Sequence, residues 1–120
     1  MATVGYLEGT DSTILTRLAI SGIDTLPLSN GVDGHGKYVN HLSKGEVDVV
    51  VGYAHKLTPA AGIPTSPKDM LFACRIQDIP VLIVAPRDTH EATKKILGEA
   101  TYKGIVAPED LFDEIKKTVG

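Results

Sequence analysis

Two short runs of aliphatic residues constrain the fold of this chain more than any other feature. They are Val47–Val51, in which Asp48 alone is polar, and Val81–Val84, and in both of them consecutive apolar side chains stand where an alternating strand would have polar ones. A strand with this pattern is buried on both faces, which occurs almost only in parallel sheets covered by helices. The two runs therefore predict a parallel sheet at the centre of the protein.

The rest of the chain alternates between strand and helix patterns. Strands are expected at Thr3–Leu7, Thr25–Leu28, Val47–Val51, Val81–Val84 and Gly104–Val106. Apolar side chains at helical spacing predict helices from Ile14 to Gly22, near Lys37 to Lys44, over Lys68–Gln77, over Thr89–Leu97 and from Pro108 onward. This order predicts the α/β class, as a three-layer open parallel sheet of about five strands with helices on both faces, the flavodoxin-like arrangement. Residues 1–120 are expected to form a single domain.

Composition excludes several classes of partner. The net charge is −3, Trp is absent and aromatic residues make up 5% of the chain, so a nucleic-acid partner is not expected. Apolar runs fall short of the ~18 residues of a membrane span, and the start of the chain does not have the pattern of a signal peptide. The single cysteine, Cys74, fits a reducing compartment, and we expect a cytoplasmic protein.

Polar loops follow the strands, at the edge where open parallel sheets bind ligands. The loop after the first strand combines Gly9 with the hydroxyl residues Thr10, Ser12 and Thr13, and the loop after the second contains Ser29, Asn30 and Gly31. Glycines allow close approach of the backbone to a ligand, and a helix start attracts anions, so both loops are candidate phosphate-binding sites. The alternative is that Asp11 or Ser12 only caps the following helix.

Titratable side chains are present at the same edge. Asp33 and His35 are candidate catalytic residues, as a base and its orienting partner, although Asp is equally typical of turns. Further candidates at the edge of the site are His55, Lys56, Arg87 and His90. The histidines do not have the spacing of a metal site, so neither a metal nor another cofactor is expected.

The stretch from Ser29 to Val51 resembles the methylglyoxal-synthase-like fold family, which includes methylglyoxal synthase and the regulatory domain of carbamoyl-phosphate synthetase. The resemblance rests on Leu28-Ser29-Asn30-Gly31, on Asp33-Gly34 and on Leu42-Ser43-Lys44-Gly45-Glu46-Val47-Asp48, with Gly9-Thr10 similar to the phosphate loop of the family. It implies that Thr10, Thr13, Ser29 and Gly31 contact a phosphate. The catalytic aspartate of the synthase falls on His35 here and its histidine falls near Thr65, so the resemblance favours a non-catalytic or regulatory version.

Three functions follow as hypotheses. The first is a domain that binds a phosphorylated metabolite or nucleotide without catalysis. The second is a lyase or isomerase that acts on a phosphorylated ketose such as dihydroxyacetone phosphate, and the third is a subunit or interaction module of a larger assembly, with a homo-oligomer left open. A weaker resemblance of Leu7-Glu8-Gly9 to Toprim domains, and a flavin stacked on Tyr53, are further alternatives.

Overall fold

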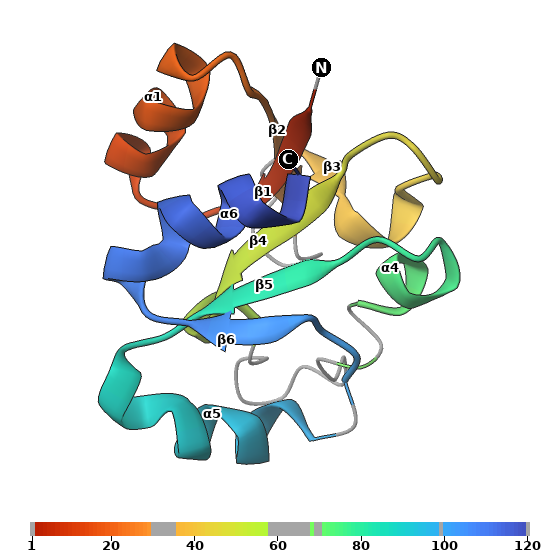
Figure 1. Cartoon of the computed structure of the whole chain (residues 1–120). Helices are drawn as coiled ribbons and strands as arrows, with labels where there is room; N and C mark the ends of the chain where they lie inside the picture. Colours follow the sequence, from red (N-terminus) through yellow and green to blue (C-terminus); the bar gives the residue numbers. More distant parts are fainter. Residues whose placement is uncertain (1, 30–35, 58–67, 69–70, 99, 120) are drawn as a thin grey trace.

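The strands form one parallel sheet (Figure 1). The computed structural model describes residues 2–29, 36–57, 68, 71–98 and 100–119. Within these residues the strands are β1 (Thr3–Leu7), β2 (Asp24–Ser29), β3 (Lys37–Tyr38), β4 (Val49–Tyr53), β5 (Val81–Val84) and β6 (Gly104–Val106). Neighbouring strands pair in parallel in the order β3-β2-β1-β4-β5-β6. The predicted α/β class and open parallel sheet are confirmed, with six strands in place of about five.

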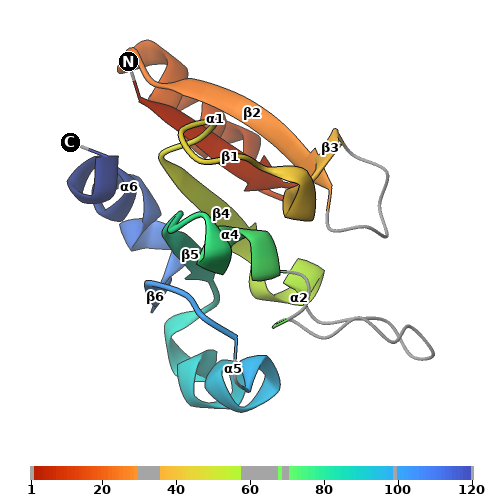
Figure 2. The same ribbon diagram turned by 90° about the vertical axis from the view of Figure 1, so that its right-hand side faces the viewer.

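Helices cover both faces of the sheet (Figure 2). They are α1 (Ser12–Ile20), α2 (Ala54–Leu57), α4 (Phe72–Ile76), α5 (His90–Leu97) and α6 (Leu111–Val119), with single 3₁₀ turns η1 (Val39–His41), η2 (Arg87–Thr89) and η3 (Pro108–Asp110). Helices α1 and α6 pack on one face, whereas η1, α2, α4 and α5 pack on the other. The connection from β1 to β2 runs toward one edge of the sheet and carries α1 on one face, whereas the connections from β4 to β5 and from β5 to β6 run toward the other edge and carry α4 and α5 on the opposite face. Right-handed crossovers require this arrangement. In the described ranges there is no helix long and apolar enough to cross a membrane.

Two buried clusters, one on each side of the sheet, form the core. On β4 the side chain of Val50 belongs to the cluster under α4 and α5, and Val49 and Val51 belong to the cluster under α1 and α6. This division follows from the alternation of side chains along a strand. It explains why β4 and β5 are apolar without interruption. Leu15 of α1 and Leu26 of β2 are only partly buried, whereas Ile14 and Leu28 of the same elements are buried.

The prediction of a helix near Lys37 to Lys44 is wrong. Lys37 and Tyr38 form β3 and pair with Leu28 and Ser29 at the end of β2, and the helical part is limited to the turn η1. Val39 and Leu42, three residues apart, are nevertheless both buried, as they would be on one face of a helix. A 3₁₀ turn brings residues i and i+3 to the same side, so it satisfies the same apolar spacing in one turn.

Local sequence explains both ends of α1. The Asp11 side chain accepts a hydrogen bond from the Thr13 backbone N–H at 2.9 Å, which makes Asp11 the N-cap. At the other end Gly22 adopts a φ of +82°, and the Ile23 N–H donates to the Leu18 carbonyl at 2.9 Å. The helix therefore ends at the glycine that the sequence predicted, in the way that glycine ends many helices.

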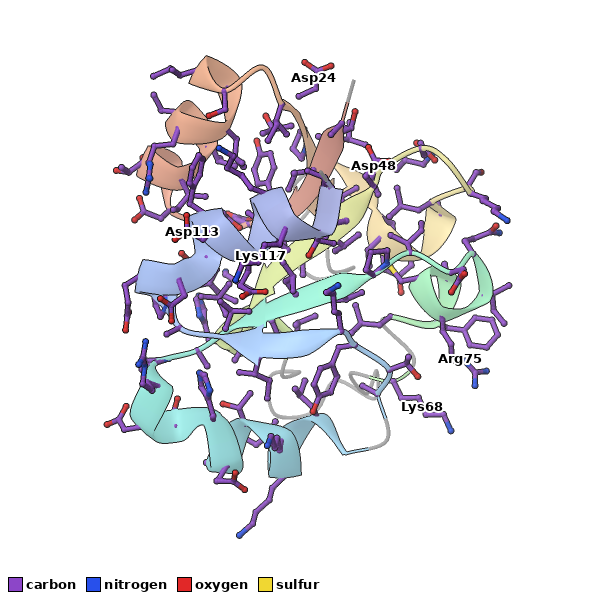
Figure 3. All side chains as sticks on the ribbon, in the orientation of Figure 1. Asp24, Asp48, Lys68, Arg75, Asp113 and Lys117 are labelled. Atoms are coloured by element: carbon purple, nitrogen blue, oxygen red, sulfur yellow. The ribbon has the colours of Figure 1, made fainter. Side chains whose placement is uncertain are left out.

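The strand order reverses at β1. From β1 the chain proceeds through β2 to β3 on one side, and it then crosses to β4, which pairs with the other side of β1. In open α/β sheets the crevice at such a reversal, beyond the carboxyl ends of the strands, is where ligands bind. Asp24 and Asp48 mark the opposite end, at the starts of β2 and β4 (Figure 3). The fold thus directs attention to the loops after β1 and β4.

Candidate functional site

Gly9 lies where the loops after β1 and β4 meet. Its φ is +89°, a conformation that favours glycine. A Cβ atom built on Gly9 would lie 3.1 Å from Cε of Lys56 and 3.2 Å from Nε2 of His55. The backbone conformation therefore favours glycine here, and a side chain at this position would also press against two side chains of α2. The structure brings together three of the predicted site residues, from two loops that are distant in sequence.

The hydroxyl residues of the β1 loop surround the start of α1. The Thr10 hydroxyl donates to the Leu7 carbonyl at 2.7 Å, so its proton is used while its oxygen can still accept. Ser12 and Thr13 are the exposed first residues of α1, and the Thr13 N–H is bound by Asp11. The capping interpretation of this loop is confirmed for Asp11. The cationic side chain in contact with Gly9 is that of Lys56.

Tyr53, the last residue of β4, connects the two loops. Burial raises the pKa of Tyr53 above its usual value, the nearby Asp11 carboxylate raises it further, and a hydrogen bond with the Asp11 backbone opposes this shift. The Tyr53 and His55 rings meet edge to face with centroids 6.1 Å apart. Tyr53 follows the third expected strand in the sequence, but its contact with Asp11 could not be predicted, because that contact depends on the pairing of β1 with β4.

The second predicted phosphate loop is described only at its beginning. Ser29 ends β2, is 5% exposed and pairs in register with Tyr38. Because β2 pairs with β1, Ser29 lies on the strand beside the Gly9 loop, as predicted. Asn30, Gly31, Asp33 and His35 lie outside the described residues.

Arg87 and His90 belong to a different part of the carboxyl edge. Arg87 forms an ion pair with Asp110 at 2.7 Å and a longer one with Glu109 at 3.5 Å, and His90 Nε2 lies 2.9 Å from the Ala85 carbonyl oxygen. Both side chains line a groove of about 620 Å³ along β6, together with Asp113 and Lys117 of α6, which Figure 3 labels. The structure therefore separates these two candidates from the group around Gly9.

The chemistry of the Gly9 site suits an anionic group better than a metal. Among the described residues there is no cluster of three histidine, cysteine or carboxylate side chains that could hold a metal ion. Lys56 supplies a cationic group and His55 a ring nitrogen, and both side chains face Gly9, whereas the Thr10 hydroxyl already donates its proton to the Leu7 carbonyl. Such groups bind phosphate or carboxylate oxygens through charge-assisted hydrogen bonds.

Neither the models of known protein families nor the curated proteins compared with the chain give a significant match.

Proposed function

We propose that this protein binds the phosphate group of a small metabolite or nucleotide where the loops after β1 and β4 meet, and that it acts as a binding or regulatory domain without turnover. The observation that carries the proposal is the position of Gly9, at a φ of +89° and in contact with Lys56 and His55, at the point where the strand order reverses.

Charge supports a single anionic group of modest size. Lys56 is the cation next to Gly9, whereas the Asp11 carboxylate at the start of α1 repels a second negative charge. The site therefore accommodates a phosphate monoester beside Lys56 better than a polyphosphate extended along the β1 loop. The resemblance of Ser29–Val51 to methylglyoxal-synthase-like proteins supports the same ligand chemistry.

Binding without catalysis is supported by the role of the carboxylate in this loop. Asp11 accepts the Thr13 N–H and stabilises the start of α1, which is a structural task that fixes its position. A general base needs access to a proton of the ligand. The carboxylate of Asp11 thus serves to build the loop, which supports binding over proton transfer at this residue.

A titration with ribose 5-phosphate and inorganic phosphate, followed by NMR and calorimetry, tests the proposal. We expect amide shifts at Gly9–Thr13 and at His55 and Lys56, and Lys56→Gln should weaken binding about tenfold, the order of one charge-assisted hydrogen bond. Lys44→Gln is the matched control, because Lys44 is an exposed lysine before β4, at the opposite end of the sheet. Equal weakening by both substitutions, or no shift at the two loops, would rule out a specific site here.

A further inference from the structure

A hollow beside the proposed site is lined by side chains that offer almost no polar atoms. It has a volume of about 250 Å³ and is lined by Ala54 and His55 of α2 and by Thr93, Ile96 and Leu97 of α5. Helices α2 and α5 lie on the same face of the sheet (Figure 2). Thr93 is 5% exposed, and its hydroxyl donates to the Thr89 carbonyl at 2.8 Å within α5. The hollow therefore presents methyl and methylene groups and one imidazole ring.

His55 belongs to both places. Its Nε2 atom lies 3.2 Å from the position of a Cβ on Gly9, and His55 is also one of the residues that line the hollow. The hollow therefore adjoins a residue that contacts Gly9, so one ligand can reach from the proposed phosphate position to the hollow. The hollow is smaller than the 300 Å³ or more that is typical of a complete ligand pocket, so it suits one part of a ligand.

We infer that the ligand of the proposed site carries a flat heteroaromatic ring beside its phosphate, as a nucleoside monophosphate does, and that this ring occupies the hollow between α2 and α5. The inference rests on the proposed function, because it assumes that the phosphate is held at Gly9 and Lys56.

The polarity of the hollow distinguishes this ligand from a sugar phosphate or triose phosphate. The hydroxyl groups of a small sugar would lose their hydrogen bonds to water against Ile96 and the methyl group of Thr93, which is costly. A heteroaromatic ring buries apolar faces there and can contact His55 edge to face or in an offset stack. Ile96 is 56% exposed, so a ring placed against it also removes an apolar side chain from water.

The test compares adenosine monophosphate with ribose 5-phosphate by calorimetry on the full chain. The two ligands share the phosphate and the sugar, so their ratio of affinities measures the ring alone. We expect adenosine monophosphate to bind about tenfold more tightly, the order gained when one ring face leaves water. Ile96→Asn should reduce this ratio to about one, because it makes this wall polar without adding a charge, and it should leave the affinity for ribose 5-phosphate nearly unchanged.

Ile76→Asn is the matched control. Ile76 is 58% exposed on α4 and does not line the hollow, so its substitution makes the same change in side-chain polarity without touching the ring. A ratio near one in the unmodified protein, with ribose 5-phosphate still bound, overturns the inference and leaves the proposed function standing. A ratio reduced equally by both substitutions also overturns the inference. Binding of neither ligand overturns the proposed function as well.

Discussion

Lys56 lies directly against Gly9: its Cε atom is 3.1 Å from the position that a Cβ on Gly9 would occupy. The two residues follow different strands, β1 and β4, and they meet because these strands are neighbours in the sheet. The contact places a cationic side chain over a backbone that only glycine adopts readily. Substitutions at this point consequently affect folding and the proposed site together.

Gly9→Ala should destabilise the fold and weaken phosphate binding. Alanine at a φ of +89° is strained by about 1–2 kcal/mol, and its methyl group would displace Lys56 and His55. Urea unfolding measures the first effect, and calorimetry with ribose 5-phosphate measures the second. Gly22→Ala is the control, because Gly22 has a φ of +82° but no atom within 4 Å of its added Cβ. Gly22→Ala should lower the free energy of unfolding by a similar amount and leave the affinity for ribose 5-phosphate unchanged. A loss of affinity in both variants would contradict the contact.

Two substitutions of Asp11 distinguish its role as the helix N-cap from its effect as a negative charge. Asp11→Ala should cost about 1 kcal/mol, since the Thr13 N–H loses its acceptor, whereas Asp11→Asn keeps an acceptor and most of the stability. Asp11→Asn should also lower the pKa of Tyr53, because the carboxylate contributes to raising it. If the proposed anion site is correct, the same variant binds ribose 5-phosphate more tightly. Urea unfolding and ultraviolet titration of the tyrosines, with Tyr53→Phe as the reference, measure these changes; a Tyr53 pKa that does not move in Asp11→Asn contradicts the interaction.

Gly5 makes room for a leucine of the neighbouring strand. A Cβ on Gly5 would lie 2.6 Å from Cδ1 of Leu28, which is fully buried. Gly5→Ala should therefore destabilise by about 1–3 kcal/mol through overpacking, and Leu28→Ala by about 2–5 kcal/mol through the cavity that it leaves. The double variant should cost less than the sum of the two, because the added methyl group occupies part of the cavity. Denaturant unfolding of the four proteins measures the coupling, and strict additivity would show that the residues do not share this space.

The sequence predicted the sheet well because its strongest signal is local. The uninterrupted apolar runs of β4 and β5 require burial on both faces, and the structure buries Val50 and Ile83 on one side and Val51 and Leu82 on the other. Strand β3 was missed because two residues, Lys37 and Tyr38, carry too little pattern of their own. They become a strand only through pairing with β2, which is a tertiary effect.

The sequence predicts which loops form the candidate site, but not which residues of those loops contact one another. Gly9 and Thr10 were recognised from glycine and hydroxyl residues before a helix, and His55 and Lys56 from their place after a strand. The sequence did not predict that these two pairs meet, since the meeting depends on β4 crossing back beside β1. For the same reason it grouped Arg87 with them, whereas Arg87 pairs with Asp110 one strand further along.

The buried thiol of Cys74 makes stability depend on pH in the alkaline range. Burial raises the pKa of Cys74 from an ordinary 9.0 to about 11, so the folded protein holds this proton more tightly than the unfolded chain does. The contribution to stability is complete below pH 9 and is lost as the pH rises toward 11, because there the unfolded chain gains by ionising first. Two pKa units correspond to at most about 3 kcal/mol.

We therefore expect the free energy of unfolding to fall more steeply between pH 9 and 11 in the unmodified protein than in Cys74→Ala. Tyr53 has a raised pKa in both proteins, so its effect cancels in the comparison. Urea unfolding at half-unit steps of pH measures the two slopes, and parallel slopes would mean that the thiol ionises equally well in the folded state.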